Sequence, residues 1–206
     1  MFTGIVAAVG QIKQVQPIDP DQADSGVRLL IDVGELDMSD VKLGDSIAIE
    51  GACMTVTSLP ESQHFTADVS RESLSKTVGL HQAGPVNLEK SLKIGDQIGG
   101  HLVSGHVDGL GHVVTFKPVG ESWLLVVLAP KALGMYLAYK GSITVNGVSL
   151  TVNEVKDTDA GTEFSINLIP HTIEVTTLQH LQPGQAVNLE IDTIARYVQR
   201  MLQHKS

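Results

Sequence analysis

Hydrophobic and polar positions alternate along many short stretches of the chain, which is the pattern of strands buried on one face. Ile47 and Ile49, followed by Met54 and Val56, show this alternation. Glycine, proline and aspartate separate the stretches at short intervals, as in tight turns. The pattern predicts an all-β fold, either a sandwich or a small barrel. We favour a six-stranded Greek-key barrel, because closure of the sheet would remove its exposed edges.

The strand pattern occurs twice along the chain. Residues 44–57 (GDSIAIEGACMTVT) align with residues 140–153 (KGSITVNGVSLTVN), so that Gly51 meets Gly147 and Cys53 meets Ser149. The openings TGIVAAVGQI and SGHVDGLGHV correspond in the same way, and each half closes on VNLE. The separation is about 100 residues throughout, which is the size of a domain. Two homologous barrels are therefore expected, over residues 1–98 and 99–190.

Residues 191–206 change from the strand period to the helix period. Apolar side chains recur there at helical spacing at Ile191, Ile194, Val198 and Met201 or Leu202. Asp192 comes early and Arg196 and Arg200 come late, as the helix dipole favours. We expect a C-terminal α-helix, whose apolar stripe packs either on the protein's own barrels or against further copies of the chain. Short helical turns are expected after Ser70 and Pro170.

Composition narrows the classes of function. The formal net charge of −9 and the pI near 5.2 argue against nucleic acid and anionic membranes as partners. A single cysteine excludes an internal disulfide, and the opening MFTGIVAAVG lacks the features of a signal peptide. No stretch approaches the ~20 consecutive apolar residues of a membrane span. The expected location is the cytoplasm.

Three histidines open the second half, at His101, His106 and His112. Spacings of five and six residues place His101 and His106 on opposite faces of a strand, and no cysteine or carboxylate completes a tetrahedral set. No metal site is therefore expected. His106 is either a general acid or base, since its ordinary pKa lies closest to neutral, or a hydrogen-bonded histidine without a chemical role.

The two halves differ at positions that could carry chemistry. His106 corresponds to Ile5, and Cys53 corresponds to Ser149. Free cysteine is often only a small buried hydrophobe, so a packing role for Cys53 is the simplest alternative. Two related but unequal sites nevertheless suit a protein that holds two copies of one small molecule in different roles.

Six segments together carry a resemblance to a known family: MFTGIV, GACMTVT, NGVSLTV, IGGHLVSGHVDG, LIPHTIEVTTL and VNLEIDTIARYV. In this combination and order the chain resembles the α-chain type of riboflavin synthase over essentially its whole length. The resemblance implies two tandem six-stranded barrels in a homotrimer held by the C-terminal helix. It also implies that each active site forms where the N-terminal barrel of one subunit faces the C-terminal barrel of another.

The family's reaction is a dismutation, in which two molecules of 6,7-dimethyl-8-ribityllumazine exchange a four-carbon unit. The products are riboflavin and 5-amino-6-ribitylaminouracil, and no metal or organic cofactor takes part. A further partner that the resemblance suggests is lumazine synthase. The strongest rival is a lumazine protein, which resembles the enzyme but binds the chromophore for optical use without turnover. A flavin-binding oxidoreductase barrel is a more distant rival, because no nicotinamide-binding domain follows.

The resemblance also transfers the family's ligand-contacting segments to this chain. In the first barrel they are Gly4, Ile5, Val6, Cys53, Met54, Thr55, Asp68, Val69, Ser70, Arg71, Glu72 and Ser73. In the second barrel they are Gly105, His106, Val107, Lys140, Ser149, Leu150, Thr151, Leu168, Ile169, Pro170, His171, Thr172 and Ile173. The two sets are related to each other by the internal repeat, which supports them independently.

The resemblance assigns roles to a few of these residues. His106 is expected to shuttle a proton, with Ser149 as polariser or orienter in the donor pocket and Cys53 as the partner on the acceptor side. Ser46 and Thr151 are expected to take part in or support the chemistry directly, and Asp192 would act at one remove from the substrate.

The first half departs from the family's pattern before its central glycine. Glu50 stands where we expect asparagine, and Ala52 follows the glycine, whereas the second half keeps Asn146. Glu50 would either alter the affinity of the first barrel or point to solvent.

Overall fold

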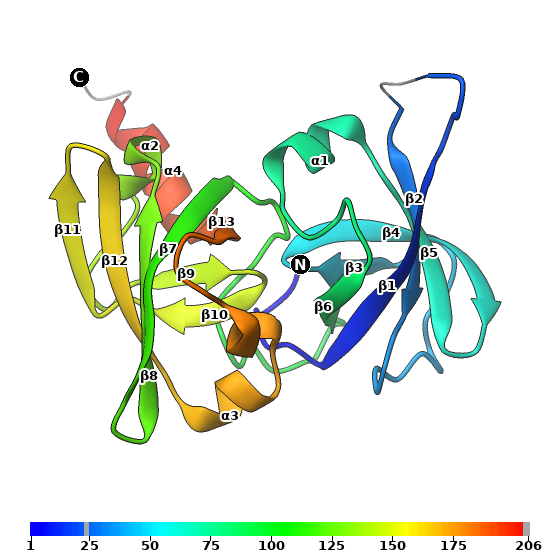
Figure 1. Cartoon of the computed structure of the whole chain (residues 1–206), viewed down its shortest axis with the longest axis horizontal. Helices are drawn as coiled ribbons and strands as arrows, with labels where there is room; N and C mark the ends of the chain where they lie inside the picture. The colour runs from blue at the N-terminus through cyan, green and yellow to red at the C-terminus, as the bar shows by residue number, and fades with distance from the viewer. Residues whose placement is uncertain (23–24, 204–206) are drawn as a thin grey trace.

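The computed structural model describes residues 1–22 and 25–203 and consists of two β-domains side by side (Figure 1). The first holds β1 (Ala8–Pro17), β2 (Val27–Asp32), β3 (Ser46–Ile49), β4 (Ala52–Glu61), β5 (His64–Val69) and β6 (Gly84–Lys90). These strands close into a barrel in the order β1-β2-β5-β4-β3-β6. The predicted six-stranded barrel is therefore confirmed in the first half.

The second half forms a curled sheet of seven strands. They are β7 (Gly109–Val119), β8 (Ser122–Ala129), β9 (Ser142–Val145), β10 (Val148–Thr151), β11 (Glu154–Thr158), β12 (Gly161–Leu168) and β13 (Ala186–Ile191). Their order is β10-β9-β13-β7-β8-β12-β11, so the two edge strands are consecutive in the chain.

The second half therefore differs from the predicted closed barrel of six strands, because it has seven strands and its sheet is open between β10 and β11. Its strands β10 and β11 occupy the place of β4, which pairs with both β3 and β5 in the first barrel. The strand β4 itself shifts register between Val56 and Ser58. In the second half the strand breaks at the corresponding residues, Val152 and Asn153, and so forms the two strands β10 and β11. Strand β10 then pairs only with β9, and β11 pairs only with β12.

Short helices connect the strands. Helix α1 (Arg71–Lys76) follows Ser70, whose hydroxyl accepts from the Ser73 amide, and α3 (Pro170–Glu174) begins at Pro170. Both predicted helical turns are therefore confirmed. Helix α2 (Lys131–Gly134) and the 3-10 helix η1 (Thr177–His180) were not predicted.

The C-terminal helix α4 runs over Thr193–Gln203. The predicted start at residue 191 is wrong, because Ile191 is buried at the end of β13 and the Asp192 carboxylate accepts from the Ile194 amide as the helix begins. Residues 204–206 of the predicted helix lie outside the described residues. Among the described helices, none combines the length and apolar character needed to cross a membrane.

Each barrel has its own hydrophobic core. Phe65, Leu29 and Leu88 belong to the first core, and Phe164, Leu125 and Leu189 belong to the second. Strand alternation sends every second side chain inward, so the positions between them face outward from the barrels.

The segments that open each half cross to the other half. We call residues 3–5 and residues 104–106 the two opening turns. The Ser149 amide donates to Gly4 O at 2.7 Å, and the Cys53 amide donates to Gly105 O at 2.8 Å. Just before the turns, Phe2 and Val103 pair in a β-bridge, and the N-terminus lies between the two barrels (Figure 1). The opening turn of each half therefore covers part of the outer face of the other half's sheet.

A second seam joins the tips of two equivalent hairpins. Gly51 and Gly147, both at positive φ, approach so closely that a Cβ added to either would lie within 3 Å of the other's backbone nitrogen. The Asn188 side chain donates to Glu50 O at 2.9 Å, and the Asn87 side chain donates to Asn146 O at 2.9 Å. These reciprocal bonds make the seam nearly two-fold symmetric.

Glu50 lies inside this seam, so the expectation that it could point to solvent is wrong. Its carboxylate accepts from the Asn87 amide at 2.8 Å and from the Thr177 hydroxyl at 3.0 Å. Asn146 makes the matching bond to the Asn188 amide at 2.8 Å. Burial raises the pKa of Glu50 to about 7, because desolvation disfavours the charged form.

Candidate functional site

Cys53 and His106 line one pocket between the two halves. Strand β4 buries Ala52 and Met54 and turns Cys53 outward, to the face covered by the second opening turn. The pocket has a volume of about 280 Å³. Helix α1 contributes Glu72, Ser73 and Lys76 to its wall, and the second half contributes Gly105, His106 and Val107. A thiol and an imidazole from different barrels thus face one small cavity.

Ser149 has a different histidine beside it. The side-chain oxygen of Ser149 lies 2.7 Å from His101 Nδ1, and His101 Nε2 lies 3.3 Å from the Thr144 hydroxyl. Burial lowers the pKa of His101, and the charge of Asp192 opposes this shift. The neutral imidazole is therefore favoured, and it can exchange a proton with the Ser149 hydroxyl.

Within the chain, His106 and Ser149 lie at different sites. Because the opening turns cross over, His106 reaches the Cys53 side and Ile5 reaches the Ser149 side. His101, which is not among the predicted site residues, lies beside Ser149. The two sites are still related by the internal repeat, and each combines residues of both halves.

The opening turns and helices bring further predicted residues to these two sites. Ile5 is half-exposed, Val6 packs against the second core, and Val107 packs against the first core. Thr55 and Thr151 are exposed on the same strand faces as Cys53 and Ser149. The charge of Asp192 acts on His101, where it raises the pKa against the effect of burial.

Residues at the starts of α1 and α3 have mixed surroundings. Arg71 begins α1. Asp68 forms a two-pronged ion pair with Arg28, at 2.7 and 2.8 Å. Ile169, Pro170 and His171 are exposed at the start of α3, Thr172 O accepts from Thr176, and Ile173 packs on the second core.

Some predicted contact residues point into the cores instead. The side chains of Met54 and Val69 belong to the first core, and those of Leu150 and Leu168 belong to the second. Their neighbours in sequence face outward, so segment-wise transfer from a family inevitably includes inward positions. Lys140, at φ 62°, donates to Asn153 at 3.1 Å and lies over the Tyr139 ring.

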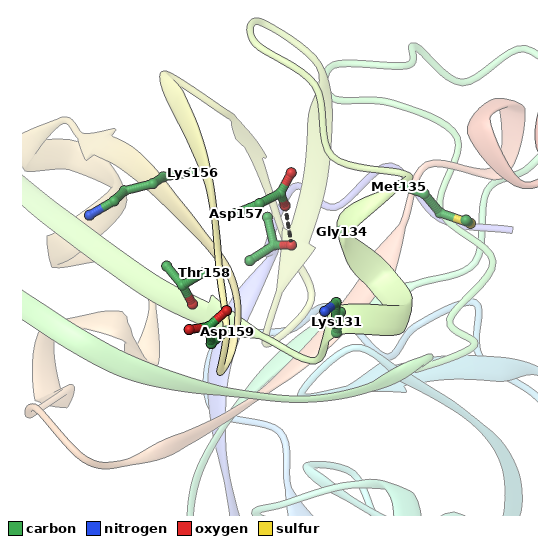
Figure 2. Close-up of a pocket in the computed structure, with 8 residues that line it drawn as sticks. Lys131, Gly134, Met135, Lys156, Asp157, Thr158 and Asp159 are labelled. Carbon is green, nitrogen blue, oxygen red and sulfur yellow. Dashed lines mark hydrogen bonds between the residues drawn. The ribbon is translucent and has the colours of Figure 1, made fainter.

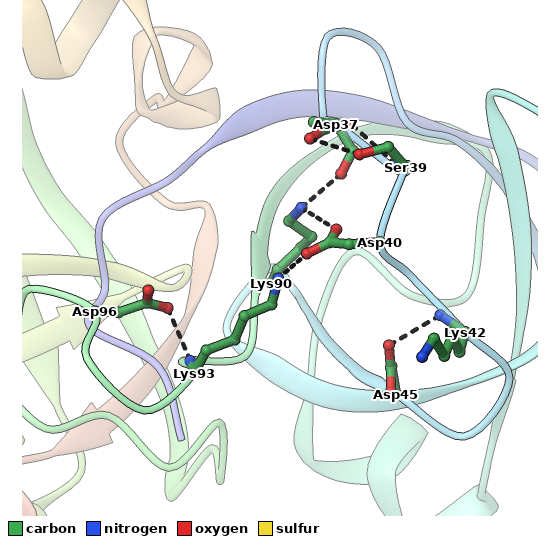
Figure 3. Close-up of polar contacts among 8 residues, drawn as sticks. All are labelled: Asp37, Ser39, Asp40, Lys42, Asp45, Lys90, Lys93 and Asp96. Carbon is green, nitrogen blue, oxygen red and sulfur yellow. Dashed lines mark hydrogen bonds and ion pairs between the residues drawn. The ribbon is translucent and has the colours of Figure 1, made fainter.

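Ser46 pairs with Thr55 across β3 and β4, and it also lines a charged pocket with Asp40, Lys90 and Lys93. There the Lys90 ammonium bridges Asp37 O and the Asp40 carboxylate, each at 2.7 Å, and Lys93 also reaches Asp40 (Figure 3). Ser46 thus lies two cross-strand pairs along from Cys53, which pairs with Ala48, although Ser46 and Cys53 line different pockets. The part of Ser46 in the chemistry stays a prediction.

A larger surface pocket, of about 810 Å³, lies between α2 and the β11–β12 hairpin. Lysine and aspartate side chains line it, and Asp157 accepts from Thr162 across its wall (Figure 2). It contains none of the predicted site residues and lies wholly within the second half. Among residues 1–22 and 25–203, no three His, Cys, Asp or Glu side chains gather as a metal site would require.

Comparison with known proteins identifies the class. The lumazine binding domain family matches this chain over residues 3–91 and 104–192. The chain therefore belongs to that family and carries its domain twice, in agreement with the two β-domains of the fold.

The names of the chain's relatives are more specific than the name of the family. The riboflavin synthases of Photobacterium phosphoreum and Brucella abortus are each 41% identical to this chain. The match covers 98% of this chain and 89% of the first protein, and 100% of this chain and of the second. A crystal structure of LumP complexed with riboflavin superposes with a TM-score of 0.78 at 26% identity, covering 93% of this chain and 99% of that one.

Proposed function

We propose that this protein is a riboflavin synthase, which converts two molecules of 6,7-dimethyl-8-ribityllumazine to riboflavin and 5-amino-6-ribitylaminouracil. The observation that carries the proposal is the pair of unequal sites, Cys53 with His106 and Ser149 with His101, on equivalent faces of two homologous barrels. Identity of 41% over the full chain to proteins named riboflavin synthase supports it.

Duplication suits this reaction because both reactants are the same planar heterocycle. Two related pockets can hold them face to face, with one as donor and the other as acceptor of the four-carbon unit. Fixing their orientation can contribute roughly 7 to 11 kcal/mol through effective molarity. Acid–base groups then need only move protons.

The two histidines suit different protons. His106 stands in the wall of the Cys53 pocket, where it can serve as proton shuttle for the lumazine bound there. The His101 imidazole can accept the proton of Ser149, so this hydroxyl can polarise or add to the second lumazine. Asp192 favours the charged form of His101 and would assist that step.

We also infer a homotrimer. The apolar stripe of α4 is exposed at Ile194, Tyr197, Val198, Met201 and Leu202. The same helix is tied to its own barrel on another face, where Arg196 pairs with Asp108 at 2.8 Å. The stripe therefore remains free for other copies of the chain, which would bring the N-terminal barrel of one subunit against the C-terminal barrel of another.

The lumazine protein remains the second candidate, because LumP, with bound riboflavin, shares the fold. Incubation of the purified protein with dimethyllumazine separates the two functions. Appearance of riboflavin fluorescence supports the enzyme. Tight binding without product would reject it in favour of the optical protein.

A further inference from the structure

A buried carboxylate holds the second opening turn. Glu190, on β13, is 2% exposed. One of its oxygens accepts from the Ser104 amide at 2.6 Å, and the other accepts from the Gly105 and His106 amides at 3.0 Å each. Three successive backbone donors of the turn are thus satisfied by one side chain.

The first opening turn is held in the same way. Glu89, on β6, is 9% exposed. It accepts from the Thr3 amide at 2.7 Å, from the Thr3 hydroxyl at 2.8 Å and from the Gly4 amide at 3.0 Å. Glu89 and Glu190 are the last residues of the repeated VNLE, so the duplication has kept both the carboxylate and its task.

Each opening turn that a carboxylate holds in this way also contacts the other barrel. Gly105 O accepts from the Cys53 amide, and a Cβ on Gly105 would stand only 2.6 Å from the Cys53 Cβ. Gly4 O accepts from the Ser149 amide, and a Cβ on Gly4 would stand 2.6 Å from the Ser149 Cβ. Each carboxylate therefore fixes a turn that touches the reactive position of the opposite barrel.

Burial makes these carboxylates costly, since desolvation raises the pKa of both, that of Glu190 to about 7. An apolar side chain in their place would leave two or three turn amides without acceptors, which costs more than the bonds themselves gain. The carboxylates are thus suited to holding a backbone in one geometry.

We propose that Glu89 and Glu190 are positioning residues, which lock the two opening turns so that His106 stands beside Cys53 and residues 3–5 stand beside Ser149. The roles of the two sites rest on the proposed function. The positioning of the two turns by Glu89 and Glu190 does not rest on it, because the reaction rate of the Cys53 thiol measures that positioning without turnover.

The test compares Glu190→Gln with Glu89→Gln. An amide keeps one acceptor oxygen but turns an NH2 group toward the turn, so part of the grip is lost. Cys53 is the sole cysteine, so the rate of its reaction with a chromogenic disulfide reagent reports on the second turn alone. Turnover of dimethyllumazine is measured in parallel, with its kcat and KM.

Glu190→Gln should raise the thiol reaction rate about tenfold, because the turn over Cys53 opens more often, while Glu89→Gln leaves that rate within about twofold. Both variants should lower kcat about tenfold with a smaller change in KM, since the turns place reacting groups. Glu190→Asp, which keeps the charge but shortens the reach, should fall between Glu190→Gln and the original protein.

Equal thiol rates in the two Gln variants would overturn the proposal. So would a Glu190→Gln and a Glu190→Asp protein that both fail to fold, because Glu190 would then be a general structural residue. If the original protein shows no turnover but the thiol rates separate as expected, the proposed function fails and the lock stands.

Discussion

At the scale of residues, the two barrels present unequal groups at equivalent positions. The Cys53 thiol has His106 in its pocket, and the Ser149 hydroxyl has His101 at 2.7 Å. Because the repeat relates the two positions, the backbones of the two sites are nearly symmetric while their reactive side chains differ. This suits a reaction in which identical molecules leave as different products.

His106→Ala is expected to lower kcat by about a hundredfold or more, as loss of a general acid–base group does, with little change in lumazine affinity. Steady-state kinetics and a fluorescence titration of the ligand give the two quantities. His112→Ala, at an exposed position of β7, is the matched control and should retain activity. Equal losses of turnover and affinity in His106→Ala would make His106 a structural or binding residue.

Ser149→Ala should lower kcat by about tenfold to a hundredfold, because His101 then has no hydroxyl from which to take a proton. The same loss is expected for His101→Ala, and the double variant should be no worse than either single one, as for groups that act as a unit. Additive losses in this double-mutant cycle would show that the two side chains act independently.

His106, Cys53 and Ser149 could be found from the sequence, because the repeat placed unlike residues opposite one another. His101 could not be found in this way, since the repeat aligns Ser104 with Thr3 and leaves His101 without a counterpart in the first half. Its contact with Ser149 joins residues 48 positions apart, and only the folded chain shows it.

At the scale of elements, alternation and turn residues predict strands such as β2 and β5 well, since these have one face more buried than the other. The crossing of the opening turns has no such signal, because it depends on backbone bonds from Gly4 and Gly105 to distant strands. The interruption between β10 and β11 follows from a local irregularity that leaves the hydrophobic pattern unchanged.

Removal of the residues after Asp192 should lower the oligomeric state, because α4 presents five exposed apolar side chains on one stripe. Light scattering measures the mass. Val198→Asp should act in the same direction, whereas Arg200→Gln, outside the stripe, should not. An unchanged mass after the deletion would contradict the inferred trimer contact.

At the scale of the whole molecule, two seams join the barrels: the opening turns, and the hairpin tips at Gly51 and Gly147. Both are built from reciprocal bonds related by the repeat. Glu50 breaks the symmetry of the second seam, because a carboxylate there stands opposite the neutral Asn146.

Glu50→Gln should raise the free energy of unfolding above that of the original protein, and this gain should be larger at alkaline than at acidic pH. The pKa of Glu50 is raised to about 7 in the fold, so its protonated form is favoured there, and its contribution to stability is lost as pH rises toward and through 7. Thermal unfolding at pH 5 and pH 8 should therefore show a gain for Glu50→Gln that is larger at pH 8, on the order of 1–3 kcal/mol.

Glu121→Gln, at an exposed turn between β7 and β8, is the control and should show no such trend. A Glu50→Gln gain that is the same at both pH values would mean that the buried carboxylate does not titrate with folding.

The most direct test of the account is the stoichiometry of the reaction with dimethyllumazine alone, without metal or added cofactor. Chromatography of the products should show two lumazine molecules consumed for each riboflavin formed, together with one molecule of the ribitylamino-uracil. Binding of lumazine without riboflavin formation, or consumption of lumazine in another ratio, would contradict the account.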